Sequence, residues 1–424
     1  MKHPPCRALC VAAGLLAATP LPAALSPEEK KIADWLAGQQ EEMIALLERA
    51  VKIDSPSENV AGVRAMHALF AGELQSLGFA PRWVALAPSS GRAGHLFADH
   101  QGTRGKRVLM IGHLDTVLPG GRFVREGDRA RGSGVSDMKG GDVVLIYAIK
   151  ALHAIGALAG AQIVVAMTGD AESLGRPIED SRRPLIEAGK ACDVALSFEG
   201  GSRTEGTVAR RGASHWELEV TAVTGHSSGV FSAALGSGAI YEAARVLDRF
   251  QVELRKLPGL TANVSVIAGG AEVTEREFGA SATGKANIIP ARTIARGDIR
   301  AVTPEQLAQA EQVMREIAAQ HLPRAESKLT FEHRYPPMAV APRHLGVLAL
   351  YDQASRDLGQ GPVAANDATR RGAGDSAFVA PHCAALDGLG VFGSGAHADR
   401  ESVDLKSLVS QSTRAAVLLY RLTR

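Results

Sequence analysis

Two potential metal ligands stand two residues apart, directly after a short apolar run. The run is Val108-Leu-Met-Ile111, which is typical of a buried strand, and His113 and Asp115 follow it. In extended backbone, side chains two residues apart point to the same side. One of the pair can therefore bind a metal while the other orients it or tunes the site.

Further residues of metal-binding types follow in order along the chain: Asp137, Glu172, Glu199 and His397. Each follows an apolar run or lies in a glycine-rich turn, which is where α/β folds place their chemistry. Histidines and carboxylates together form a nitrogen and oxygen ligand set that suits zinc. Any one of these residues taken alone is more often structural, so the ordered set carries the prediction.

These motifs together resemble those of the zinc-dependent glutamate carboxypeptidases (carboxypeptidase G type), in a family that also contains aminoacylases, dipeptidases and succinyl-diaminopimelate desuccinylase. The resemblance runs from about residue 26 to the C-terminus. It implies two zinc ions per chain, bridged by Asp137, with Asp115 supporting the first histidine. It also implies a cis peptide bond at Asp137-Met138. The implied ligands are His113, Asp137, Glu172, Glu199 and His397.

The chain departs from this family at the general base. The family has Asp-Glu-Glu in the acidic segment, with the first glutamate as the base, whereas this sequence has Asp170-Ala171-Glu172. A register shifted by one would make Glu172 the base and leave Ser173 as a ligand, which is poor zinc chemistry. We therefore keep Glu172 as a ligand and place the missing base at Ala171. Loss of a positioned base typically costs ~10²–10⁴ in rate, so a weak hydrolase, an inactive paralogue and an altered site all stay open.

Three residues in the middle of the chain are candidates for substrate binding. His226 lies in a turn-like loop, Asn287 precedes Ile-Ile-Pro290, and Arg300 ends Gly-Asp-Ile-Arg. From the residues alone, His226 is a solvated loop histidine and Arg300 belongs to a surface ion pair of little energetic value. The resemblance implies instead that His226 stabilises the oxyanion, often across a dimer, and that Asn287 and Arg300 grip the substrate carboxylate.

Two segments near the C-terminus are candidates for supporting roles. Gly372-Ala-Gly-Asp375 is a glycine-rich turn, to which we assign backbone shaping rather than catalysis. Glu401 follows His397 by four residues, a spacing that allows it to support a metal ligand.

The composition limits the class of protein. The chain has 424 residues, 46% hydrophobic and 22% charged, which is ordinary for a soluble globular protein of two or three domains. A net charge of +2, with no basic run containing aromatics, argues against a nucleic-acid scaffold. The N-terminal apolar run is too short for a stable membrane span.

Residues 1–24 have the form of a secretory signal peptide, with a short positive segment, an apolar stretch and a candidate cleavage site at 21–24. The alternative is a frayed apolar tail. We therefore predict a periplasmic or secreted protein. After cleavage Cys192 and Cys383 would remain, and separate buried thiols are favoured slightly over a disulfide, since spacing alone fixes no geometry.

The elements that position these residues alternate between strand and helix up to about residue 199. Ser26-Pro27-Glu-Glu is a helix start, because serine can cap the helix and proline suits its first turn. Helical patterns follow near 63–77 and 142–152, and 163–168 is predicted as a buried strand. This order predicts an α/β fold whose mixed, mostly parallel sheet is covered by helices.

From about residue 208 the pattern changes to strands with one exposed face. The predicted order is strand, helix, two strands, helix and strand, which is a split βαβ sandwich. We predict a catalytic domain at 25–210 and 337–424, interrupted by a smaller α+β lid domain at 211–336. The resemblance implies that this lid also serves for dimerisation, so the expected partner is a second copy of the chain.

Two functions from different classes fit these residues. The first is a two-zinc amidohydrolase that cleaves the amide bond of an N-acyl amino acid or small peptide with a free C-terminal carboxylate. The resemblance implies a preference for C-terminal glutamate. The second, favoured by Ala171, is a non-catalytic zinc-binding periplasmic protein that binds carboxylated peptides.

Overall fold

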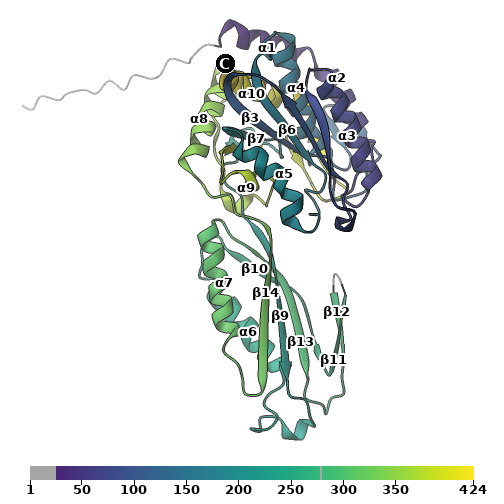
Figure 1. Cartoon of the computed structure of the whole chain (residues 1–424), viewed down its shortest axis with the longest axis vertical. Coiled ribbons are helices and arrows are strands. Elements are labelled where there is room, and N and C mark those ends of the chain that lie inside the picture. The colour runs from purple at the N-terminus through teal and green to yellow at the C-terminus, as the bar shows by residue number, and fades with distance from the viewer. Residues whose placement is uncertain (1–24, 277–278) are drawn as a thin grey trace, which may run out of the picture.

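The computed structural model describes residues 25–276 and 279–424, so the predicted signal peptide lies outside the described residues. Figure 1 shows two units: a larger one built from both ends of the chain, and a smaller one built from its middle. Within the described ranges no helix has both the length and the apolar character needed to cross a bilayer.

The larger unit is built on a six-stranded sheet of order β1-β2-β6-β3-β7-β16. The pairs from β6 to β16 are parallel, whereas β1–β2 and β2–β6 are antiparallel. The predicted mixed, mostly parallel sheet is therefore confirmed. The strands are β1 (Ala80–Ala85), β2 (Gly94–His100), β3 (Arg104–His113), β6 (Ala161–Thr168), β7 (Val194–Ser197) and β16 (Ala384–Leu386).

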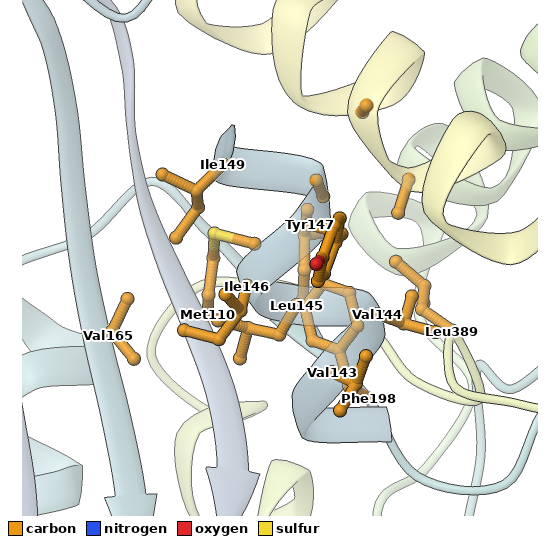
Figure 2. Packing of buried hydrophobic residues seen from close by; sticks show 14 of the residues in the cluster. Met110, Val143, Val144, Leu145, Ile146, Tyr147, Ile149, Val165, Phe198 and Leu389 are labelled. Atoms are coloured by element: carbon orange, nitrogen blue, oxygen red, sulfur yellow. The ribbon is translucent and has the colours of Figure 1, made fainter. Parts of the chain in front are cut away.

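Helices cover both faces of this sheet because successive strand residues point to opposite sides. On β3, Val108 and Met110 belong to the larger core, while Leu109 and Ile111 belong to a second core with Leu185. Figure 2 shows Met110 packed against the apolar residues of α4. The helices are α1 (Pro27–Ala37), α2 (Gln40–Val51), α3 (Val60–Gln75), α4 (Lys139–Ala154), α5 (Ile178–Lys190), α8 (Pro342–Asp357), α9 (Ser376–Val379) and α10 (Lys406–Thr423).

The first of these helices begins as predicted. The Ser26 side chain accepts a hydrogen bond from the Glu29 amide, and the Glu29 carboxylate accepts one from the Ser26 amide, which forms a capping box. Pro27 occupies the first turn, where its missing N–H costs nothing.

The smaller unit is an antiparallel sheet of order β10-β13-β9-β14 with α6 and α7 on one face (Figure 1). Trp216, Leu218 and Val220 of β9 are buried against those helices, whereas His215 and Glu217 lie on the uncovered face. The order of elements confirms the predicted split βαβ sandwich. They are β9 (Ala213–Ala222), α6 (Ala239–Leu254), β10 (Thr261–Gly270), β13 (Arg292–Arg300), α7 (Pro304–Ala318) and β14 (Ala325–Tyr335).

A short hairpin, β11 (Glu272–Arg276) and β12 (Gly279–Thr283), was not predicted. It lies beside the sheet of the smaller unit in Figure 1, and Glu275 pairs there with Arg292 and Arg296 at 2.6 and 2.5 Å. The hairpin has few apolar residues, so its sequence lacks the alternation that marks the other strands.

Short strands complete the larger unit. The most important for the site is β18, which pairs with both β17 and β5 and so brings the C-terminal turn beside the segment that precedes α4. These strands are β4 (Val124–Glu126), β5 (Arg129–Arg131), β8 (Glu205–Gly206), β15 (Ala364–Ala365), β17 (Gly393–Ser394) and β18 (Ser402–Asp404).

The two cysteines of the described residues, Cys192 and Cys383, are buried free thiols. Burial raises the pKa of Cys192 to about 11 and that of Cys383 to about 12. Both thiols are therefore protonated and unreactive near neutral pH.

Candidate active site

The predicted metal ligands meet at one edge of the large sheet. His113 ends β3, while Glu172 and Glu199 follow the neighbouring parallel strands β6 and β7. The carboxyl ends of parallel strands lie at the same edge, which is where such folds bind ligands. Asp137, just before α4, and His397, in the turn between β17 and β18, join them around a cavity of about 580 Å³.

Asp137 lies between the two histidines. Its Oδ1 is 3.5 Å from Nε2 of His113, and its Oδ2 is 3.0 Å from Nε2 of His397. Glu199 Oε1 lies 3.8 Å from Nε2 of His113, and Glu172 Oε2 lies 3.4 Å from Nε2 of His397. Glu172 Oε1 also lies 3.9 Å from Nε2 of His113. Asp137 and Glu172 thus each lie near both histidines, and the cluster as a whole suits divalent metal ions.

The protonation of this cluster also indicates a site for divalent cations. Burial, followed by the charge of Asp137, raises the pKa of Glu199 to about 8. Hydrogen bonds that His397 donates to the carboxylates of Asp137 and Glu172 raise its pKa to about 10. Without a metal, protons therefore neutralise the packed carboxylates, and a divalent cation would replace them.

We expect zinc binding to release protons and to strengthen as the pH rises. At pH 7 both Glu199 (pKa about 8) and His397 (pKa about 10) hold a proton in the metal-free protein. A metal must displace these protons, so affinity should increase until the pH passes about 10. Calorimetry in two buffers of different ionisation enthalpy measures the number released. An identical heat in both buffers would contradict the expectation.

Asp115 supports more than the first histidine. Its carboxylate Oδ1 lies 3.5 Å from Nδ1 of His113, and its backbone oxygen lies 3.0 Å from the same atom. The buried carboxylate also accepts hydrogen bonds from Ser57 Oγ (2.6 Å) and from the amides of Ala171 (3.0 Å) and Glu172 (2.9 Å). It therefore fixes the backbone that carries both the ligand Glu172 and the missing base.

Glu401 supports Asp137, one of the predicted metal ligands. Its buried carboxylate accepts hydrogen bonds from the amides of Gly134 (2.7 Å), Ser136 (2.7 Å) and Asp137 (2.9 Å), and from Ser136 Oγ at 2.9 Å. The Asp137–Met138 peptide bond is cis, as the resemblance implied.

The variant Glu401→Gln is expected to lower zinc affinity by about 10- to 100-fold, which is typical when a partner of a metal ligand is lost. A neutral amide accepts these N–H groups more weakly and turns its own N–H₂ toward one of them, so the Asp137 loop loses its fixed position. Competition with a chelator of known affinity measures the change. Retention of wild-type affinity would show that the loop holds its shape without the charge.

Ala171, at the position expected for the general base, supplies no carboxylate to the cavity. The Ala171 carbonyl accepts a hydrogen bond from Tyr335 OH at 2.6 Å, and the residue lines the cavity beside Glu172. Asp170 points away and forms a buried ion pair with Arg182 at 2.5 Å, so it does not substitute for the absent glutamate.

The predicted substrate residues are divided between two places. Arg300 lines the cavity, and its Nε donates to Asp298 Oδ2 at 2.9 Å. His226 and Asn287 lie together in the smaller unit, with Nε2 and Nδ2 3.5 Å apart, and neither is among the residues that line this cavity. Within one described chain, the oxyanion role implied for His226 is therefore not assembled.

Sequence reasoning missed Arg210. This buried arginine lines the cavity, donates from Nε to Asp387 Oδ2 at 2.6 Å, and has Nη2 3.9 Å from Glu199 Oε2. The signal available in the sequence was the Arg-Arg-Gly segment at 210–212, directly before a predicted strand. Nothing local to that segment indicated burial beside a glutamate.

Known proteins share both the sequence pattern and the fold. Residues 208–326 match the M20 peptidase dimerisation domain, which falls largely on the smaller unit. The chain is 27% identical over 396 residues to carboxypeptidase G2 of Pseudomonas sp. (strain RS-16), covering 90% of this chain and 89% of that protein. Over most of its length the chain is therefore similar to peptidases of the M20 family.

Solved structures of peptidases share the fold of this chain. An aminopeptidase PepT from Bacillus cereus ATCC 10987 has a TM-score of 0.70 at 16% identity, covering 91% of this chain and 99% of that chain. A dinuclear metal-binding peptidase of the M20 family from Bacillus subtilis has a TM-score of 0.62 at 14% identity, with coverages of 91% and 99%. M20 peptidases are metal-dependent enzymes that hydrolyse amide bonds, and the cluster of His113, Asp137 and Glu172 is of a metal-binding type.

Proposed function

We propose that this chain is an M20 peptidase that binds two zinc ions and hydrolyses the amide bond of an N-acyl amino acid or small peptide with a free C-terminal carboxylate. C-terminal glutamate is the proposed preference. The observation that carries the proposal is the position of Asp137, whose two oxygens face different histidines, Oδ1 toward His113 and Oδ2 toward His397. One carboxylate that faces two histidines is suited to bridge two metals.

Each side chain has a proposed role. Zinc, when bound, would polarise the scissile carbonyl and lower the pKa of a water. Arg300 is placed at the cavity wall to hold the substrate carboxylate with its two terminal nitrogens, Nη1 and Nη2, since Nε donates to Asp298. Asp115 and Glu401 hold the ligands in position. At Ala171 the chain supplies no proton acceptor, so turnover is expected to be slow.

We propose a homodimer formed through the smaller unit. Its match to a dimerisation domain supports this, as do exposed apolar residues on α6 and on the edge strand β10: Ile240, Tyr241, Val264 and Ile267. Exposed apolar patches mark interaction surfaces. Pairing would also allow His226 and Asn287 to reach the cavity of the partner. Sedimentation velocity tests the dimer, and a monomer at micromolar concentration would refute it.

Hydrolysis by metal-loaded protein is the experiment that tests the function. The protein is loaded with zinc and incubated with N-acetyl-glutamate, and the release of glutamate is followed. We expect slow release that a chelator abolishes and added zinc restores. Release that survives complete metal removal would refute the metal-dependent mechanism.

The second candidate is the non-catalytic zinc-binding protein that Ala171 favours. It predicts two bound zinc ions and measurable affinity for carboxylated peptides, with no turnover. Binding without hydrolysis at high protein concentration would select it. We also propose export to the periplasm or outside the cell, which fractionation of cells that express the full chain would test.

A further inference from the structure

Arginines dominate the cavity wall around the metal ligands. The carboxylates Asp137, Glu172 and Glu199 face the two histidines, and five arginines line the rest of the same cavity: Arg210, Arg300, Arg334, Arg370 and Arg371. If metal ions occupy the carboxylates, the wall presents a surplus of positive charge. A surplus of this kind favours an anionic ligand.

Three of these arginines have carboxylate partners. Arg210 pairs with Asp387 at 2.6 Å, Arg300 with Asp298 at 2.9 Å, and Arg370 with Glu205 at 3.3 Å. Arg334 is at the end of β14, in the smaller unit. Arg371 belongs to the larger unit, which also carries every metal ligand.

Arg371 is a half-buried cation without a partner. In the ranges 25–276 and 279–424, no carboxylate forms an ion pair with its guanidinium. A Cβ placed on Gly388 would lie 3.5 Å from its Nη2, so the guanidinium lies beside the residue that follows Asp387. Burial, followed by the charge of Arg210, lowers the pKa of Arg371. The charges of Asp387, Glu199 and Glu205 act in the opposite direction, each with a smaller effect. A half-buried cation that forms no ion pair is unfavourable until an anion binds.

We propose that Arg371 binds a second carboxylate of the substrate, in addition to the one assigned to Arg300. The inference rests on the proposed function and narrows it: the substrate is at least a dianion. The second carboxylate belongs either to an acidic side chain on the released amino acid or to an acidic acyl group. A cavity of about 580 Å³ is within the usual size range of small-molecule sites and has room for both groups.

Matched ligand pairs test the assignment. Each pair differs only by a carboxylate and its neutral amide: N-acetyl-glutamate with N-acetyl-glutamine, and N-succinyl-alanine with N-succinamoyl-alanine. Zinc-loaded wild-type protein and Arg371→Gln are compared by Kd for ligands that are not turned over and by kcat/KM for those that are. The control variant is Arg356→Gln, which removes an exposed arginine paired with Asp352 on α8.

We expect the wild type to prefer the carboxylate of one pair by about 10- to 100-fold, the usual value of a hydrogen bond to a charged group. Arg371→Gln should reduce that preference to less than about threefold and leave the affinity for the neutral amide nearly unchanged, whereas Arg356→Gln should change neither. If Arg371→Gln loses the preference for N-acetyl-glutamate over N-acetyl-glutamine, the second carboxylate belongs to the amino acid. If it loses the preference for N-succinyl-alanine over N-succinamoyl-alanine, the second carboxylate belongs to the acyl group.

Two results would overturn the assignment: no preference for either carboxylate, or a preference that Arg371→Gln leaves intact. Failure of the proposed function has a different signature. In that case none of the four compounds is hydrolysed, while the Kd values still report whether Arg371 recognises the carboxylate.

Discussion

Glutamate at position 171 is expected to raise kcat/KM of the zinc-loaded protein by ~10²–10⁴, the usual contribution of a positioned general base. The backbone there is held on both sides, since the Ala171 amide donates to Asp115 Oδ1 and its carbonyl accepts from Tyr335 OH. A longer side chain at this position enters the cavity beside Glu172. The variant Ala171→Glu therefore supplies a carboxylate without rebuilding the loop.

Ala171→Gln is the matched control because it has the same shape and no charge to accept a proton. Release of glutamate from N-acetyl-glutamate is measured for all three proteins, with zinc content determined in each. Equal rates for the glutamate and glutamine variants would show that a base is not what the site lacks. A wild type as fast as Ala171→Glu would mean that proton transfer uses another group.

The variant Asp170→Asn is expected to lower the free energy of unfolding by about 3–5 kcal/mol, because a buried charge that loses its partner is strongly destabilising. Asp170 and Arg182 are both fully buried and pair at 2.5 Å, and Arg182 Nε also lies 3.0 Å from Asp375 Oδ1. The remaining oxygen of Asp170 accepts hydrogen bonds from Gly175 N and Ser181 Oγ. Urea denaturation of the metal-free protein measures the change.

Asp128→Asn is the comparison for this variant, since Asp128 forms an exposed ion pair with Lys406 and should cost less than about 1 kcal/mol. Equal effects of the two variants would contradict the argument.

The contribution of the Asp170 ion pair to stability depends on pH, and its sign follows from the pKa of Asp170. Burial opposes ionisation of Asp170, but Arg182 and His95 lower its pKa to about 2 from an ordinary 3.8. Its contribution is therefore complete above pH 3.8 and is lost as the pH falls through about 2.

The metal ligands could be predicted because their positions follow from local patterns. An apolar run marks each strand, and the parallel arrangement brings the ends of β3, β6 and β7 to one edge, so His113, Glu172 and Glu199 converge. The fold of the smaller unit could be predicted equally well, because polar and apolar residues alternate along strands with one exposed face. Its polar hairpin carried no such pattern.

Contacts between distant parts of the chain could not be predicted. Glu401 supports Asp137, which is 264 residues away in the sequence, and its position in the sequence did not indicate which ligand it would support. Arg371 is distinctive because the fold half-buries it near Arg210 while no carboxylate of the described residues forms an ion pair with it. Whether a charge is paired depends on the tertiary structure, and single-sequence patterns contain no information on that point.

The link between Glu401 and the Asp137 loop also has a consequence for biosynthesis. A growing polypeptide exposes His113, Asp137, Glu172 and Glu199 while both His397 and Glu401 are still to be synthesised. The complete ligand set can therefore form only after the last part of the chain has left the ribosome and docked against the first. A chain that folds after export would take its metal from the compartment in which it folds, and the supply of ions there would decide which metal it carries.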